Sequence, residues 1–479
     1  MITGLKKHLE GPGGIGQMVG IALPMVASSA CETAMTFTDR LFLSRLGPEY
    51  MSAAMGGGLS VFLMMTFFLG LTGYTTALAA QYLGRRQHRH CALTVTQAVL
   101  IALAAYPVIL AARPLAHLFF EAMGIPADQL APQRMYFDIL IYGTLIGLLR
   151  NCLSCFFSGI GRTRVVMVAA LAAMVVNIGA NYVLIFGKLG LPALGIRGAA
   201  LGTIAGSLCA LAVLAAVYLR ADNRGSFQVA QSIRVDKQVM AKLCRFGYPA
   251  GLEFFLNLLA FTIMIFLFQS QGVVTAAAVT IVFNWDMVAF VPLVGINIGI
   301  TSLVGRFMGA GLPDTAHRAT LSGLKLAWMY SACTFIAFAV FPGYLVGIFQ
   351  PAQTEGVFAE VYPLAVSMLR LAALYVFADA MFLVFSGALR GAGDTFWAMC
   401  ISVAFHWLLV VLLWVLLRVL GTSPLPAWLT LCLVFMMFSF AFYLRYHGGK
   451  WRTLRIVEPE PEPDTFPPAA DSFHEPPDL

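Results

Sequence analysis

Long apolar stretches follow one another along nearly the whole chain, separated by short polar segments. Each stretch has about 20 residues or more, the length that an α-helix needs to cross the hydrocarbon core of a membrane. The pattern predicts an all-α polytopic membrane protein with twelve transmembrane helices. The predicted spans are approximately 19–45, 51–83, 93–120, 135–158, 165–186, 192–219, 245–269, 275–308, 319–349, 361–386, 396–418 and 426–446.

Several of these stretches are longer than a straight crossing requires. A long span is accommodated by tilting or by a kink, and proline favours a kink because it removes one helix hydrogen bond. The prolines at 24, 107, 249 and 292 are therefore the expected kink positions.

Composition supports the membrane assignment. Hydrophobic residues make up 59% of the 479 residues and charged residues only 11%, and the mean hydropathy is +0.82. The net charge of +7 does not indicate nucleic-acid binding, because the basic residues are scattered over many loops. Most of the nine cysteines fall inside spans, which favours packing over disulfides, and the same holds for the Cys152 and Cys155 pair.

Lysine and arginine positions predict the orientation in the membrane. With both termini inside, most basic residues fall in the inner segments, for example Arg85, Arg220 and Lys450, as the positive-inside rule requires. We therefore expect a multi-pass protein of a bacterial-type plasma membrane with both termini cytoplasmic. No cleavable signal peptide is visible, so the first span is expected to direct insertion.

The chain also resembles itself at a shift of 225 residues. Pro24 then aligns with Pro249, and Gly84 aligns with Gly309. An even number of spans per half predicts two pseudo-symmetric six-helix lobes related as parallel repeats, with a cavity between them. The expected segments are a cytoplasmic start at 1–18, an N-lobe at 19–219, a linker at 220–244, a C-lobe at 245–446 and a disordered, acidic, Pro-rich tail at 447–479.

Acidic residues inside the apolar spans are the main functional candidates. An ionised Asp at the bilayer centre costs roughly 2.5–3.5 kcal/mol, so such residues are usually functional. Asp379 follows Tyr375 by one helical turn, and Asn257 follows Glu253 by the same spacing. These four side chains would supply hard oxygen ligands for a proton or sodium ion, with Tyr375 and Asp379 as a candidate sodium site.

The first half has its own polar set. Glu32 and Asp39 are spaced to share one face of the first span, and Asn177 and Asn181 share a face of the fifth. Asp39 is a candidate for cation coupling, whereas Glu32 either joins it or pairs with a polar neighbour. Asp286, in the eighth span, is a candidate substrate contact in the cavity.

Nothing in the sequence indicates catalysis. The eight histidines are scattered, and no nucleophile stands with a base or in a metal-binding cluster. His406, alone on an apolar helix, is interpreted as a packing residue. The chain is therefore expected not to be an enzyme and to need no cofactor beyond a coupling ion, H+ or Na+.

Three motifs resemble the multidrug and toxic compound extrusion (MATE) family. They are TDRLFLSRLG at 38–47, NYVLIFGKLGLPALGIRGAALGT at 181–203 and SGALRGAGDT at 386–395. The resemblance implies two six-helix lobes and alternating-access export of amphipathic, often cationic compounds in exchange for protons or sodium, by a monomer in a lipid membrane.

The resemblance also implies roles for single residues. Asp39 matches the family's first-span acid, and Asn177, Asn181 and Thr203 match its N-lobe polar set. Tyr375 and Asp379 match its tenth-span pair. The chain departs from the pattern at Asn257, where members with a C-lobe sodium site usually carry Glu.

Two alternatives remain open at this point. A lipid-linked precursor flippase of the same broader superfamily would need a strongly cationic cavity, and the basic residues inside the spans are few, chiefly Arg150 and Arg370. A polytopic membrane enzyme is the other alternative, and turnover of a lipid without ion-coupled flux would favour it.

Overall fold

The computed structural model describes residues 11–122, 125–350 and 355–458, and every regular element in these ranges is a helix. The α-helices are α2 (Ile15–Ser44), α3 (Pro48–Gly73), α4 (Thr75–Gly84), α5 (His88–Ala111), α6 (Arg113–Ala122), α7 (Ala127–Gly159), α8 (Thr163–Phe186), α9 (Ile196–Tyr218), α10 (Ala221–Ser226), α11 (Lys237–Gln269), α12 (Val273–Gly309), α13 (Pro313–Val340), α14 (Pro342–Gly347), α15 (Glu355–Ala392), α16 (Thr395–Trp414) and α17 (Pro424–His447). Three short 3-10 or π turns are η1 (Val229–Ser232), η2 (Val415–Val419) and η3 (Lys450–Thr453).

Twelve helical segments in the described ranges are long and apolar enough to cross a membrane, which confirms the predicted fold class. The second span consists of α3 and α4 together, joined at Tyr74. The third span ends at Ala111, not near residue 120 as the hydrophobic pattern predicted. The remaining residues form the separate helix α6, whose charged side chains turn to α7.

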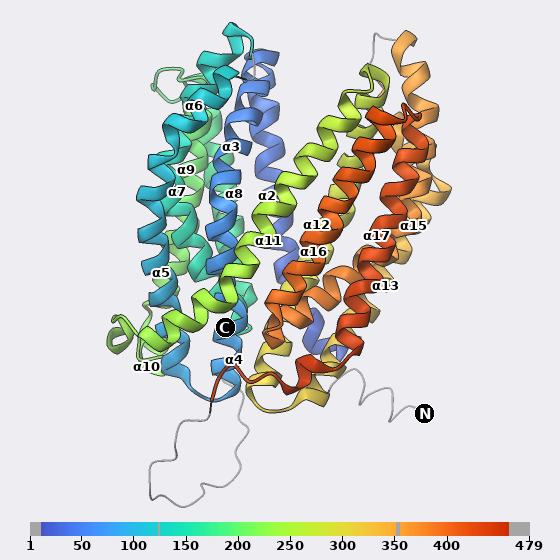
Figure 1. Cartoon of the computed structure of the whole chain (residues 1–479). Coiled ribbons are helices and arrows are strands. Elements are labelled where there is room, and N and C mark those ends of the chain that lie inside the picture. Colours follow the sequence, from blue (N-terminus) through green and yellow to red (C-terminus); the bar gives the residue numbers. More distant parts are fainter. Residues whose placement is uncertain (1–10, 123–124, 351–354, 459–479) are drawn as a thin grey trace, which may run out of the picture.

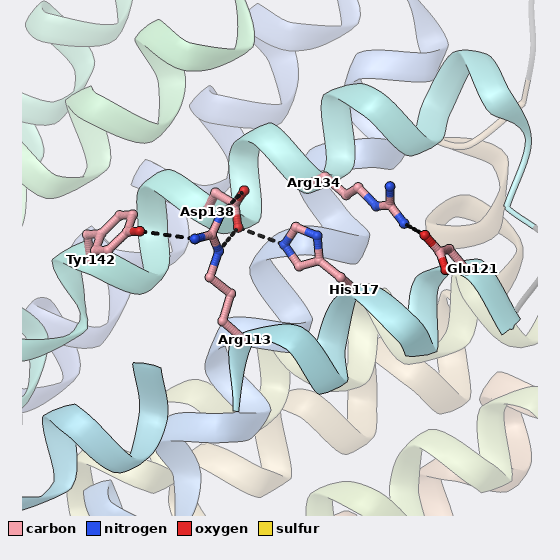
Figure 2. A network of polar contacts seen from close by, with 6 residues as sticks. All are labelled: Arg113, His117, Glu121, Arg134, Asp138 and Tyr142. Carbon is pink, nitrogen blue, oxygen red and sulfur yellow. Dashed lines mark hydrogen bonds and ion pairs between the residues drawn. The ribbon is translucent and has the colours of Figure 1, made fainter. Parts of the chain in front are cut away.

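The contacts of α6 with α7 form a polar network (Figure 2). The Nε and Nη2 atoms of Arg113 each donate to one carboxylate oxygen of Asp138 at 2.7 Å. The His117 Nε2 atom lies 2.8 Å from the same carboxylate, and Arg134 pairs with Glu121 further along. The two-pronged bond to Asp138 raises the pKa of Arg113 above its ordinary value, so the guanidinium stays charged.

The helices form two lobes (Figure 1). Helices α2 to α9 make up the N-lobe and α11 to α17 the C-lobe, and the lobes diverge away from the end of the molecule where α10 lies. We call the end with α10 the linker end. Buried aromatic side chains fill each lobe, for example Phe137 and Phe156 in the N-lobe and Phe268 and Trp428 in the C-lobe.

The lobes meet along a seam at the linker end, where α2, α3 and α4 contact α11 and α12. Gly84 lies so close to the Arg306 carbonyl, and Gly309 so close to the Gln81 carbonyl, that neither position has room for a Cβ atom. Gly84 and Gly309 are 225 residues apart in the sequence, and so are their contact partners Arg306 and Gln81. The seam is therefore built twice by the internal repeat, and small residues let the backbones approach closely.

Hydrogen bonds also cross the seam. The Gln81 side chain donates to the Gly391 carbonyl at 2.8 Å, and Ser302 donates to the Gly159 carbonyl at 3.1 Å. Both bonds are buried. Because each joins one lobe to the other, the linker end is closed in this structure.

The segments between and after the lobes are more ordered than their composition suggested. α11 already begins at Lys237, inside the predicted linker, because Asp236 caps it by accepting from the backbone N–H groups of Gln238 and Val239, each at 3.0 Å. In residues 448–458, which the sequence assigned to the tail, the side chains of Trp451, Ile456 and Val457 are buried against the rest of the protein. The rest of the predicted tail, 459–479, lies outside the described residues.

Candidate functional site

Two helices of the N-lobe bring polar side chains to Asp39 on α2. Asn181 on α8 donates from its amide nitrogen to one carboxylate oxygen of Asp39, and Thr203 on α9 donates to the other at 3.2 Å. Gly202 leaves the space that the Asn181 side chain occupies, since a Cβ atom there would meet the Asn181 carbonyl oxygen. The predicted grouping of Asp39 with the Asn181 and Thr203 side chains is therefore present.

This carboxylate faces a cavity of about 540 Å³. Asn177 and Tyr136 line the cavity beside Asp39, and the rest of its wall is largely apolar. The apolar part of the wall includes Met35, Met55, Met65, Leu59, Val61 and Phe62. A soft, methionine-rich wall beside the Asp39 carboxylate suits amphipathic cations of varied shape.

Glu32 lies on the same cavity wall but has a partner of its own. The Arg150 guanidinium on α7 donates to the Glu32 carboxylate at 2.9 Å. Glu32 was expected either to join Asp39 or to pair with a polar neighbour. The structure contains the second contact, with Arg150. Among the described residues Asp39 makes hydrogen bonds but no ion pair.

The C-lobe brings together a different set from the one expected. The Tyr375 hydroxyl on α15 donates to Asp286 on α12 at 2.8 Å, and Asp379 is buried one turn beyond Tyr375. The Asp286 and Asp379 carboxyl groups are near enough to interact electrostatically. The Phe435 ring stacks on the Tyr375 ring, with centroids 5.8 Å apart. Asp286, expected as a substrate contact, therefore lies with the tenth-span pair.

Glu253 and Asn257 lie elsewhere. Glu253 is buried against the Arg390 guanidinium, with 3.2 Å between Nη2 and the carboxylate, and the Asn257 amide donates to the Ser402 hydroxyl at 2.7 Å. Arg390 stands eleven residues after Asp379 on α15, about 16 Å along the helix axis. The described contacts do not join Glu253 and Asn257 to Tyr375 and Asp379.

The N-lobe site has spare acceptor capacity. The side-chain carbonyl oxygens of Asn177 and Asn181 are buried and have no hydrogen-bond partner within the described ranges. A carboxylate, two amide oxygens and a hydroxyl form an all-oxygen set that suits a proton carrier or an alkali cation. No cluster of three or more His, Cys, Asp or Glu side chains that would hold a transition metal occurs in the part of the chain that the structure describes.

Two participants were missed by the sequence reading. Tyr136, which lines the cavity beside Asp39, lies at the start of a predicted span, and nothing in its sequence neighbourhood indicates a contact with the first span. Arg390 lies in the SGALRGAGDT motif at 386–395, where it is part of the last turn of α15 and reaches Glu253. The only sequence signal for Arg390 was its position beside a glycine-rich helix end, which does not reveal its partner on α11.

A family model described as MatE matches residues 24–183 and 249–416, which cover most of both lobes. The chain belongs to the MatE family. Its relatives include the multidrug resistance protein PmpM of Pseudomonas aeruginosa, 26% identical over 82% of this chain and 81% of that protein. A probable multidrug resistance protein NorM of Mesorhizobium japonicum is 29% identical over 81% of this chain and 84% of that protein.

Solved structures of MATE transporters share the fold. A multidrug resistance MATE family transporter in an outward-facing conformation superposes with a TM-score of 0.82 at 17% identity, over 94% of this chain and 98% of that one. A MOP superfamily transporter from Pyrococcus furiosus gives a TM-score of 0.83 at 18% identity, over 93% and 98%. The expected family and architecture are confirmed: this is a multi-pass membrane transporter of a non-enzymatic family, in which efflux by cation-coupled antiport is general.

Proposed function

We propose that this MATE transporter exchanges drug-like, amphipathic and often cationic molecules for a proton or sodium ion that binds at Asp39. The observation that carries the proposal is the Asp39 carboxylate in the N-lobe cavity, held by neutral donors and free of any ion pair among the described residues. Neutral donors orient the carboxylate without cancelling its charge. A cation or a cationic drug is then the natural counter-charge.

Coupling follows from competition for this charge. A proton or sodium ion on Asp39 removes the negative charge that favours a cationic ligand, so the ion and the drug stabilise different occupied states. One elementary charge that moves through about 100 mV supplies roughly 2.3 kcal/mol, which sustains a concentration ratio of a few tens-fold. Entry of the cation at Asp39 would thereby drive release of the drug.

The C-lobe supplies a second candidate site. Asp286 and Asp379 place two carboxyl groups beside one phenol, so a single bound proton or sodium ion would relieve their mutual repulsion. Glu253 is the weaker candidate, because Arg390 already neutralises it. We therefore assign cation coupling in this lobe to Asp286, Tyr375 and Asp379.

Substrate export is supported over lipid-precursor flipping by the charge of the cavity. The two acids Glu32 and Asp39 line it together with two arginines, Arg40 and Arg150, and Arg150 is paired with Glu32. A pyrophosphate-bearing lipid would need an excess of unpaired cations. We also propose that the protein is a monomer of the bacterial inner membrane with both termini, and hence the linker end, on the cytoplasmic side.

Dye efflux in proteoliposomes tests the proposal. A proton gradient and a sodium gradient are imposed in separate experiments on the wild type and on Asp39→Asn, with Asp222→Asn in the exposed linker as the matched control. We expect Asp39→Asn to lose gradient-driven efflux by at least about tenfold while Asp222→Asn retains it. Wild-type efflux by the Asp39→Asn protein under both gradients would refute the assignment.

A further inference from the structure

The chain continues past α17 as an ordered strap, defined here as residues 448–458, that leaves the C-lobe and runs beneath the molecule to the N-lobe (Figure 1). Its first part is fixed to the C-lobe. The buried Trp451 ring stacks on Tyr446 with centroids 4.9 Å apart, and its indole nitrogen donates to the Tyr446 carbonyl at 2.9 Å. Arg452 donates to Asp314 on α13 at 3.1 Å. The strap therefore has a firm base on one lobe.

The second part of the strap is buried in the other lobe. Ile456 and Val457 are only 7% and 3% exposed, and they belong to the apolar core that contains Tyr74 and other N-lobe residues. Beyond them, the Gln87 side chain, in the turn after α4, donates to the Glu458 carbonyl at 3.3 Å. The strap thus joins the two lobes through its own backbone.

Ile456 sits at the seam itself. It packs so tightly against Gly393, at the end of α15 in the C-lobe, that Gly393 has no room for a Cβ atom. The neighbouring Gly391 carbonyl accepts the seam hydrogen bond from Gln81. The strap therefore covers the point at which α4 and α15 contact one another, and Ile456 touches both sides.

We infer that the strap is a latch that holds the linker end closed. We call Ile456 and Val457, the two strap side chains buried in the N-lobe core, its bolt. The inference rests on the proposed alternating access, in which the lobes must part at the linker end in one half of the cycle. Ile456 and Val457 bury their side chains only while the lobes are together, so they stabilise the closed state and not the open one. For the linker end to open, Ile456 and Val457 must leave the N-lobe core, or the contacts of Trp451 and Arg452 with the C-lobe must break.

Truncation can separate the latch from the last residues of the chain. Residues 459–479 follow the strap directly in the sequence and carry acidic residues and prolines. Removal of these residues alone leaves the strap complete, whereas ending the chain after Leu454 removes the bolt as well. The two truncations therefore separate the effect of the latch from that of the tail.

Spin labels on the two lobes measure the opening directly. Labels at Arg164→Cys on α8 and Phe396→Cys on α16, both exposed near the linker end, are placed in a full-length protein whose native cysteines have been replaced, in lipid nanodiscs. The distribution of distances between the two labels is measured in three proteins. They are the protein with the unaltered strap, the double variant Ile456→Ser/Val457→Ser, and the chain ended after Leu454. Leu454→Ser, at an exposed strap position, and the chain ended after Glu458 are the controls.

We expect the ratio of open to closed distances to rise at least about tenfold in the double variant and in the chain ended after Leu454, because two aliphatic side chains no longer stabilise closure. The two controls should match the unaltered strap. The protein with the unaltered strap should open on a change of pH, sodium or drug. If it does so but the bolt variants show the same distance distribution, the latch is wrong and alternating access stands. If no variant and no condition separates the lobes, both the latch and the proposed mechanism fail.

Discussion

At the residue scale, the acids inside the membrane differ in the groups that contact their carboxylates. Asp39 is held by an amide and a hydroxyl, Asp286 by a phenol, and Glu253 by a guanidinium. Hydrogen bonds from neutral groups leave the charge of a carboxylate available to a mobile cation, whereas an ion pair does not. Acidic side chains in the spans are therefore candidates for coupling at Asp39 and Asp286, whereas the contact of Glu253 is an ion pair.

Removing Arg390 tests the structural role of Glu253. Arg390→Gln leaves a buried carboxylate without its cation and should lower stability by roughly 1–3 kcal/mol, less than the 3–5 kcal/mol of a fully buried pair because Arg390 is partly exposed. Thermal unfolding in detergent measures the loss. The double variant Glu253→Gln with Arg390→Gln should recover most of it. Additive losses in the double variant would show that the two side chains do not act as a pair.

At the scale of elements, the seam depends on helices that approach at glycine. Gly84→Ala and Gly309→Ala each place a methyl group against a carbonyl of the opposite lobe. We expect each to hinder closure of the linker end and to slow dye efflux at least about tenfold, and the two effects should be similar because the repeat relates the two positions. Efflux in proteoliposomes measures both.

The control for the seam is a helical glycine in open space. A Cβ atom on Gly73, at the end of α3, meets nothing within 4 Å. Gly73→Ala should therefore transport at the wild-type rate. Equal slowing by Gly73→Ala would mean that loss of backbone freedom, not closure of the seam, explains the effect.

The docking of α6 on α7 is a separate element-scale prediction. Asp138→Ala removes the acceptor shared by Arg113 and His117 (Figure 2), so α6 should open locally more often. Hydrogen exchange of the α6 backbone amides should speed up about tenfold, while exchange in α8 stays unchanged. Asp128→Ala, in the exposed first turn of α7, is the control and should leave α6 protected.

At the scale of the whole molecule, hydrophobic runs and the internal repeat were enough to predict twelve spans in two halves, because span length and alternation are local properties of the sequence. The N-lobe grouping of Asp39 with Asn181 and Thr203 came from the family resemblance. The coupling roles of all these residues stay predictions.

Side-chain partners between distant spans could not be predicted. Asp286 and its partner Tyr375 are 89 residues apart in the sequence, and Glu253 and its partner Arg390 are 137 residues apart. Such pairs depend on helix rotation and depth, which periodicity does not fix when helices are apolar on all sides. The strap was missed for another reason: Ile456 and Val457 are too few to stand out from a polar context, and only the seam gives them a place to pack.

The most direct test of the central claim is exchange measured in reverse. A drug gradient is imposed across proteoliposomes without any ion gradient, and the counter-movement of protons or sodium is recorded. The account predicts that the wild type moves one of these cations in the direction opposite to the drug and that Asp39→Asn, though inserted and folded, moves neither. Cation movement by Asp39→Asn at the wild-type rate would contradict the claim that the coupling ion binds at Asp39.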